Sequence, residues 1–559
     1  MKKRNLILLI SLFSLGTISG CGNSSSSECD DMFCEEPSTS TQKQEIALEA
    51  YKEENYVFDE TVTNENGSVS YEIFVRSFYD SDFDGVGDFN GVSAQLPYLQ
   101  DLGIKTIWLM PIMPSMSYHG YDVVDYYDVN SDYGTMADFE SLVAKAKEHN
   151  IDVMIDIVFN HSSNYNEWFI QSYNDYVNNN ESEGSKKDWY CWGDKKQSGY
   201  NMYPGSNNCY YESRFDSSMP DFNTKNQEVR DEMVKILKYW VDKGVKGFRF
   251  DAVKYFDYEV TSYNTQFLTY LTDIIKDYDP SVYFVGECWD NSTVVTSYYN
   301  SSFDSFFKFN ASLEGRGEDA ILAQVKGLRN SNTFATLIEK QEKEMKDRNP
   351  NAYSSYFLSN HDMDRASNSL TGNYAKLAAS LTYLLPGTPY MYYGEEILLM
   401  GKRNTTPDDL SDSRRRLPMI WDGTNSDGQC GFPEPNRTDL MEYDQVKDGV
   451  KQAKEENYSV WNHYKKVINI RNKYPFIKQS IFTNVTKELN TEHDNILAYK
   501  LSYGDEYIVV IHNFELENVE VDVSNLGSEI LDEVSAVKLS PSLENGKLRI
   551  GRYSTVILG

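Results

Sequence analysis

The sequence predicts an α/β protein: a (β/α)8 barrel with a small domain inserted after the third strand and an antiparallel β-sandwich at the C-terminus. Three observations predict this class. Short β-branched or aromatic runs alternate with helical patterns, a long irregular segment follows the third run, and strands without helices end the chain. With 559 residues and 40% hydrophobic content, the chain is large enough for more than one domain.

Eight runs have the composition of buried strands. The segments between them include residues 136–150 and 227–244, where apolar residues recur at helical spacing and Gly or Asn stands near the end. Strands that alternate with helices form parallel sheets, and eight such units close into a barrel. The predicted strands are residues 69–78, 104–110, 151–158, 245–250, 282–287, 303–309, 353–359 and 388–394.

Two segments depart from this alternation. Residues 159–223 are too long for a connecting loop and are rich in Asn, Tyr, Gly and Ser, which predicts the inserted domain. The barrel then consists of residues 51–158 and 224–475. Residues 476–559 show alternating strands without helices, and we expect this sandwich to cover a flank of the barrel.

The N-terminus has the features of an export signal. Residues 1–20 have a basic start and an apolar run too short to span a bilayer, and their end before Cys21 resembles the bacterial lipobox. Residues 21–50, rich in Ser, Thr and acidic side chains, predict a disordered tether. We therefore expect a cell-surface protein, held at the outer face of the bacterial membrane by lipid on Cys21. An ordinary secretory signal with an incidental cysteine is the alternative.

The composition excludes one class of partner. A formal net charge of -32 leaves no basic stripe that could displace counterions from a phosphate backbone, so we expect no nucleic-acid partner. The charge fits a neutral substrate or bound cations, although a solvated acidic surface explains most of it. We expect a monomer.

Seven cysteines are present, without the CxxC or Cys/His clusters that are typical of zinc sites. Cys191 and Cys209 bracket a Gly-, Asn- and Tyr-rich loop. Their spacing is compatible with a local disulfide in an oxidising exterior, and the sequence alone does not decide whether it forms.

Carboxylates follow four of the predicted strands. In a (β/α)8 barrel the carboxyl ends of the strands meet at one face, which is where catalytic groups of this fold lie. One such residue alone would be a surface charge, but four that converge without a metal-ligand pattern or phosphate loop point to glycosidic cleavage. The carboxylates are Asp156, Asp251, Glu287 and Asp362, and Arg249, His161 and His361 accompany them.

The motifs around these residues carry a family resemblance. Four segments resemble, in order, the four signature regions of the α-amylase family, whose lipid-anchored bacterial members the chain also resembles at its N-terminus. The resemblance continues through residues 119–129, 219–223 and 387–396, so it extends from about residue 69 to the C-terminus. The four segments are DIVFNH (156–161), GFRFDAVK (247–254), VGECW (285–289) and FLSNHD (357–362).

The resemblance implies a role for each matching residue. Asp251 would be the nucleophile, Glu287 the acid and base, and Asp362 the group that holds sugar hydroxyls in the transition state. Tyr121 is expected to stack under the sugar at the cleavage point, and Lys254 to meet the leaving-group side. The side chains expected to contact substrate are those of Tyr118, His119, Tyr121, Asp156, His161, Arg249, Lys254 and His361.

An acidic loop follows the first predicted strand and resembles the calcium loop of some family members. Acidic residues alternate along it, with Gly85 and Gly87 for tight turning, and oxygen-rich loops of this kind suit Ca²⁺. It lacks the Glu that closes an EF-hand loop, and a plain Asp/Gly turn is the alternative. The expected ligands are Asp80, Asp82, Asp84, the Val86 carbonyl and Asp88. A second ion at Asn160 is left open, because Tyr255 stands where many relatives have His.

The expected activity is retaining, endo-acting hydrolysis of α-1,4-glucosidic bonds in starch and maltooligosaccharides. Tyr118 stands where exo-acting relatives carry an Asp that closes the pocket behind a terminal glucose, which favours an open cleft. The alternatives within the family are an exo-acting α-glucosidase, an oligo-1,6-glucosidase, a neopullulanase or a glucanotransferase. A non-catalytic glucan-binding protein would be expected to lack Asp251 or Glu287.

Overall fold

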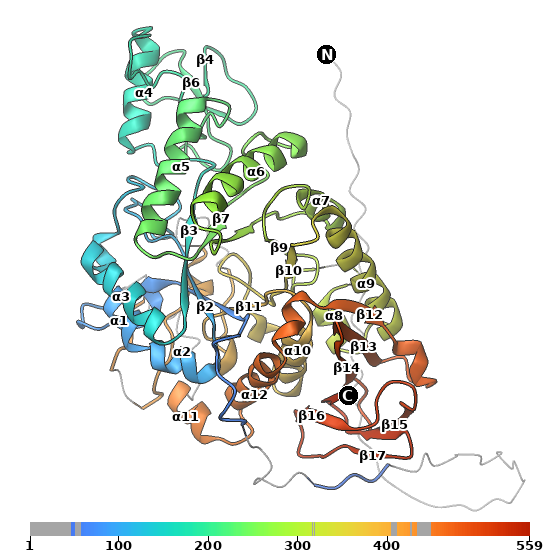
Figure 1. The fold of residues 1–559 in the computed structure, drawn as a ribbon. Helices are drawn as coiled ribbons and strands as arrows, with labels where there is room; N and C mark the ends of the chain where they lie inside the picture. Colours follow the sequence, from blue (N-terminus) through green and yellow to red (C-terminus); the bar gives the residue numbers. More distant parts are fainter. Residues whose placement is uncertain are drawn as a thin grey trace, which may run out of the picture. The chain divides into compact units, whose positions relative to one another are not determined.

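The computed structural model describes residues 46–50, 58–315, 317, 319–403, 411–424, 427–432 and 449–559, all within the unit Glu45–Gly559 (Figure 1). The predicted signal and Cys21 lie outside the described residues. Within the described part of the chain, no helix is long and apolar enough to cross a bilayer.

Eight parallel strands form the sheet at the centre, in the order β10-β9-β8-β7-β3-β2-β1-β11. A parallel bridge between Phe357 and Tyr390 joins the two edges, so the sheet curls into a barrel. All eight predicted strands are confirmed, and each is shorter than its predicted run. The strands are β1 (Ser70–Ile73), β2 (Thr106–Leu109), β3 (Asp152–Ile157), β7 (Gly247–Phe250), β8 (Tyr283–Gly286), β9 (Ser305–Phe307), β10 (Tyr353–Ser355) and β11 (Tyr390–Tyr392).

The register of these strands brings catalytic side chains together. Asp156 of β3 pairs with Arg249 of β7, and residues paired in this way point to the same face of the sheet. Asp251 follows β7 directly and Glu287 follows β8 directly. The carboxyl end of the barrel therefore gathers charged groups from neighbouring strands.

Helices follow most of the strands. In α3, Thr135 and Asp138 form a capping box, and Phe139, Leu142 and Ala146 form the buried face. The α-helices outside the inserted segment are α1 (Phe89–Ala94), α2 (Leu96–Leu102), α3 (Met136–Glu148), α5 (Gln227–Asp242), α6 (Thr261–Tyr278), α7 (Ser292–Tyr298), α8 (Ile321–Val325), α9 (Ser331–Arg348), α10 (Asn373–Leu384), α11 (Val450–Glu455) and α12 (Val460–Lys473). Short 3-10 turns occur at η2 (Val75–Ser77), η3 (Ser131–Tyr133), η4 (Ala366–Asn368), η5 (Glu395–Ile397), η6 (Ser413–Arg415), η9 (Pro475–Gln479) and η10 (Thr486–Leu489).

The segment between β3 and α5 is drawn in cyan and green in Figure 1. It contains α4 (Glu167–Val177) and a three-stranded sheet in the order β4-β6-β5, made of β4 (Trp192–Gly193), β5 (Tyr200–Met202) and β6 (Tyr210–Glu212). Aromatic rings pack between helix and sheet: Phe169 stacks on Trp192 with centroids 5.3 Å apart.

The disulfide considered between Cys191 and Cys209 is not formed, and both residues are free thiols in the structure. The reason is the register of β4 on β6, which pairs Trp192 with Tyr211 and Gly193 with Tyr210. Continued by one residue, this register sets Cys191 opposite Glu212, three residues along the strand from Cys209. That offset corresponds to roughly 10 Å, beyond the reach of a disulfide.

Two antiparallel sheets form the C-terminal part. The five-stranded sheet has the order β12-β13-β14-β19-β16 and the three-stranded sheet the order β15-β18-β17. A separate apolar core that includes Ile511, Val556 and Ile550 lies between them. Asn484 of β12 donates to Thr336 of α9 (3.0 Å), so one edge of this sandwich contacts a barrel helix. The strands are β12 (Ile481–Asn484), β13 (Ile496–Tyr503), β14 (Glu506–Asn513), β15 (Val519–Asp522), β16 (Ile530–Ser535), β17 (Ser542–Glu544), β18 (Lys547–Ile550) and β19 (Ser554–Leu558).

Candidate active site

One buried guanidinium joins three carboxylates at the carboxyl end of the barrel. Arg249 Nη1 lies 2.6 Å from Asp251 Oδ1 and 2.9 Å from Asp156 Oδ1, and its Nη2 lies 3.0 Å from Glu287 Oε2. The Arg249 side chain is only 1% exposed. Because a buried charge is stable only when it is paired, this network fixes the positions of all four side chains.

The backbone turns sharply between the two central carboxylates. Ala252, directly after Asp251, has φ 49°, a left-handed conformation that is uncommon for a non-glycine residue. Its N–H donates to Glu287 Oε2 (2.9 Å). The Oε2 atom of Glu287 therefore accepts from Ala252 as well as from Arg249, and Oε1 takes part in neither contact.

Burial sets the protonation of these carboxyls. It raises the pKa of Glu287 to about 7; Arg249 opposes this rise, and Asp251 adds to it. Burial also raises the pKa of Asp251, which Arg249 opposes through its contact with Oδ1. Near neutral pH, Glu287 is therefore able to hold a proton, while Arg249 stabilises the negative charge of Asp251.

The second group of site residues surrounds His361. Its Nε2 lies 3.0 Å from Asp362 Oδ2, and its Nδ1 lies 2.6 Å from Glu72 Oε1. The Tyr121 ring stacks on the imidazole at 14°, and its hydroxyl lies 2.6 Å from Nε2. Arg416 Nη2 holds the other oxygen of Asp362 at 2.9 Å. The Asp362 side chain remains 31% exposed, so a ligand in the barrel mouth can reach it.

These contacts set opposite charges on two neighbouring groups. Burial alone would raise the pKa of Asp362, but His361 and Arg416 outweigh burial and hold it well below its usual range. Burial alone would lower the pKa of His361, but Asp362 and Glu72 raise it to about 9. Asp362 is thus an ionised acceptor beside a cationic imidazole.

The remaining predicted substrate residues differ in their surroundings. His161 is buried, its pKa is lowered by burial to about 3, and its Nε2 has no hydrogen-bond partner among the described residues. His119 Nδ1 accepts from the Tyr121 N–H (3.1 Å). Lys254 bonds Asp290 Oδ2 (2.7 Å) and the Trp289 carbonyl (3.0 Å), so it is tied to the loop that follows Glu287.

Tyr118 is half-buried and packs edge-on against Phe74, with ring centroids 5.3 Å apart. Its hydroxyl is buried and has no hydrogen-bond partner among the residues that the structure describes. The ring thus occupies this position without presenting a carboxylate.

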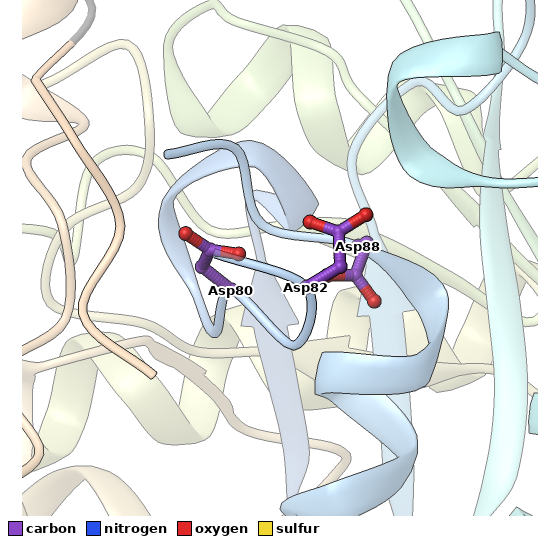
Figure 2. A group of neighbouring side chains, drawn as sticks. All are labelled: Asp80, Asp82 and Asp88. Atoms are coloured by element: carbon purple, nitrogen blue, oxygen red, sulfur yellow. The ribbon is translucent and has the colours of Figure 1, made fainter. Parts of the chain in front are cut away.

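The acidic loop between β1 and α1 brings together three of its five predicted ligands. Carboxylate oxygens of Asp80, Asp82 and Asp88 lie within 4.8 Å of one another (Figure 2). Asp84 is not part of this group, and its Oδ1 accepts from the Val86 N–H (2.7 Å).

Hydrogen bonds hold these carboxylates in place. Asp80 accepts from the backbone N–H groups of Phe83 (2.7 Å) and Gly85 (2.8 Å), and Asp88 accepts from Ser81. Among the described residues, no Lys or Arg pairs with Asp80, Asp82 or Asp88. Like charges at this spacing repel, and a cation with oxygen ligands would offset the repulsion, so the donor set fits Ca²⁺.

Two family models match most of this chain. The family model described as alpha amylase, catalytic domain, matches residues 72–480, and that of the alpha-amylase SusG C-terminal domain matches residues 496–557. The chain belongs to the alpha-amylase family. This family hydrolyses glycosidic bonds and acts on α-glucans, so the chain is a glycoside hydrolase.

Individual relatives of this alpha-amylase family member cover most of its length. Alpha-amylase 3 of Dictyoglomus thermophilum is 37% identical over 497 residues, which span 88% of this chain and 93% of the relative. The solved structure of Eubacterium rectale Amy13B superposes with a TM-score of 0.82 at 34% identity, covering 92% of this chain and 99% of that one. An oligo-1,6-glucosidase of Bacillus cereus is 28% identical and covers 86% of this chain and 97% of its own. Family membership therefore establishes that the chain hydrolyses glycosidic bonds. It does not establish which bond is preferred, because the relatives include both an alpha-amylase and a 1,6-glucosidase.

Two residues of this alpha-amylase family site were missed by the sequence analysis, Glu72 and Arg416. Glu72 is the one acidic residue of the first predicted strand, residues 69–78, a signal that could have marked it. Arg416 lies in a run of three arginines without a strand or helix pattern, so nothing distinguished it from its neighbours.

Proposed function

We propose that this alpha-amylase family member is a retaining, endo-acting hydrolase of α-1,4-glucosidic bonds in starch and maltooligosaccharides. The observation that carries the proposal is that Arg249 forms ion pairs with both Asp251 and Glu287, while burial raises the pKa of Glu287 to about 7. A nucleophile kept charged beside an acid that keeps its proton is the arrangement that double displacement requires.

In the first step Asp251 attacks the anomeric carbon while Glu287 gives its proton to the departing glycosidic oxygen. Because Oδ1 of Asp251 is bonded to Arg249, Oδ2 is the attacking atom. Because Oε2 of Glu287 accepts from Ala252 and Arg249, its proton resides on Oε1. The C–O bond to the leaving sugar breaks as the ester to Asp251 forms.

In the second step Glu287, now a carboxylate, takes a proton from water, and the resulting hydroxide attacks the anomeric carbon. The ester bond breaks, Asp251 leaves as a carboxylate, and both groups return to their starting states with the anomeric configuration retained. Asp362 accepts hydrogen bonds from sugar hydroxyls, and these bonds strengthen as positive charge develops on the ring.

Internal cleavage is supported by Tyr118. Its ring packs on Phe74 and offers no carboxylate to close a pocket behind a terminal glucose. Because an oligo-1,6-glucosidase is among the relatives, at 28% identity, exo-acting cleavage is the second candidate.

Calcium binding at the acidic loop is part of this proposal. Asp80, Asp82 and Asp88 would hold the ion, with Asp84 and the Val86 carbonyl completing the oxygen set. The ion would stabilise the loop between β1 and α1 and supplies no group to the reaction. We also propose that the protein acts as a monomer at the cell surface, anchored through lipid on Cys21.

A time course of products on starch, pullulan and maltotriose tests the activity. Endo-cleavage predicts a rapid fall in the iodine colour of amylose while reducing ends rise slowly and short maltooligosaccharides accumulate. Glucose as the sole product from the first minutes, with iodine colour persisting, would assign an α-glucosidase. Preferential cleavage of pullulan would assign a neopullulanase.

A further inference from the structure

The imidazole of His361 lies between two carboxylates in the closed interior of the barrel. Glu72 Oε1 lies 2.6 Å from Nδ1 and Asp362 Oδ2 lies 3.0 Å from Nε2, and the ring itself is fully buried. A neutral imidazole has one N–H and one lone pair. In either neutral tautomer a lone pair would face a carboxylate oxygen, which is repulsive, so the geometry favours a proton on both nitrogens.

The other groups around the ring fit a cation. The Tyr121 hydroxyl is 2.6 Å from Nε2 and 3.1 Å from Asp156 Oδ2, so it can accept from the imidazole and donate to the carboxylate. Trp108, which carries no charge, packs against the imidazole in a T-shaped arrangement. Arg416 directs its Nε to the His361 carbonyl (3.1 Å) and its Nη2 to Asp362, and Arg249 bonds Asp156 and Asp251, so neither guanidinium faces a ring nitrogen.

We propose that Glu72 is a positioning residue that keeps His361 doubly protonated throughout the working pH range of the enzyme. Through His361 it orients Asp362 and Tyr121, two groups that the proposed function places against the sugar. Glu72 itself sits on β1 and touches neither the substrate nor the reacting atoms. The inference rests on the proposed function only for the role of Asp362, since the charge state of His361 is a property of the free protein.

Removing the charge of Glu72 should change the protonation of His361. Without it, His361 loses its Nδ1 proton at lower pH, and the remaining N–H can serve only one side of the ring. The ion pair between His361 and Asp362 is then lost, even where residue 72 still hydrogen-bonds Nδ1. The two carboxylate partners of His361 raise its pKa to about 9, although burial alone would lower it.

The test combines a titration with a matched pair of variants. Among the seven histidines, His361 is followed by ¹⁵N imidazole spectra in selectively labelled wild-type protein and assigned with His361→Gln. The Glu72→Gln variant keeps the shape of the side chain and removes the charge, and its amide can accept from or donate to Nδ1. Glu342→Gln is the control, because Glu342 is also a buried glutamate, and among the described residues it accepts hydrogen bonds from Ser354 and Tyr356, not from a histidine.

In wild-type protein both ring nitrogens of His361 should remain protonated at about pH 8, and in E72Q the ring should be neutral there. The kcat/KM of E72Q should match that of wild type at about pH 5 and lie roughly tenfold or more below the wild-type value measured at about pH 8, because each pH unit above the pKa removes a factor of ten in the cation. E342Q should keep the wild-type profile. A neutral His361 in wild-type protein near pH 7, or a cationic His361 in E72Q at about pH 8, overturns the proposal.

The outcomes remain distinct from those of the proposed function. If E72Q does not fold, the wild-type titration decides, since loss of the His361 proton near its ordinary pKa contradicts the proposal and loss well above it supports it. An exo-acting product pattern would overturn the endo assignment and leave this titration unaffected.

Discussion

Arg249 determines what each neighbouring carboxyl can do. It contacts Asp156, Asp251 and Glu287 at once, yet the three groups differ in their other contacts. Asp251 has the shortest contact, at 2.6 Å, whereas Glu287 also accepts from a backbone N–H, and burial raises its pKa to about 7. The division into nucleophile and acid thus arises from small differences around one shared cation.

Removing either functional group should abolish a chemical step and leave the fold intact. Asp251→Asn removes the attacking oxygen, and Glu287→Gln removes the transferable proton, so turnover on soluble starch should fall by roughly 10²–10⁴-fold or more. Initial rates of reducing-end release measure this, with the thermal midpoint as a control for folding. Near-normal turnover in either variant would contradict the assigned roles.

The pH dependence follows from the pKa of Glu287. The acid form is required, and it is lost as pH rises through about 7, so kcat/KM should decline on the alkaline side of that value. Because burial raises the pKa of Glu287, this carboxyl keeps its proton at pH values where an ordinary glutamic acid has already lost it. Rates measured across a pH series at low starch concentration locate this limb. An alkaline limb near the ordinary pKa of Glu, below about 5, would contradict the acid role of Glu287.

At the scale of elements, the loop between β1 and α1 links metal binding to stability. Three carboxylates converge there while backbone N–H groups hold the turn. Since such a loop gathers negative charge only when folded, a cation should bind the folded chain and not the unfolded one. Its contribution is therefore a linkage effect on unfolding and not a catalytic one.

Calcium should raise the thermal midpoint of the protein, and a chelator should lower it. The expected gain is about 2.7 kcal/mol when free calcium exceeds its dissociation constant a hundredfold. Asp82→Asn should weaken the response, whereas Asp128→Asn, outside the cluster, should preserve it. An unchanged midpoint and metal content after exhaustive chelation would show that the loop is only a turn.

The strands were predictable because each barrel strand is a short apolar run bounded by polar residues, as in residues 151–158 and 245–250. The carboxylates at the strand ends were predictable for the same reason. The contact of Glu72 with His361 was not, because it joins residues 289 positions apart through the closure of the barrel. Whether Cys191 pairs with Cys209 could not be predicted, because it depends on strand register, which spacing in the sequence does not determine and which sets Cys191 opposite Glu212.

At the scale of the whole molecule, the expected anchor determines where the enzyme works. Cys21→Ser removes the sulfur that would carry the acyl chains, so the variant should leave the membrane fraction or fail to mature. Fractionation of cells that express the wild-type or variant protein measures this. Unchanged membrane association of the variant would contradict the lipobox interpretation.

The central claim, double displacement through Asp251, is tested most directly by trapping the covalent intermediate. The protein is incubated with a fluorinated maltosyl fluoride whose glycosyl ester hydrolyses slowly, and the digested protein is examined by mass spectrometry. One added fluorinated maltosyl group is expected on the peptide that contains Asp251, and no label is expected on the Asp251→Asn variant. Attachment of the sugar to a different residue, or full activity on starch without any trapped ester, would contradict this claim.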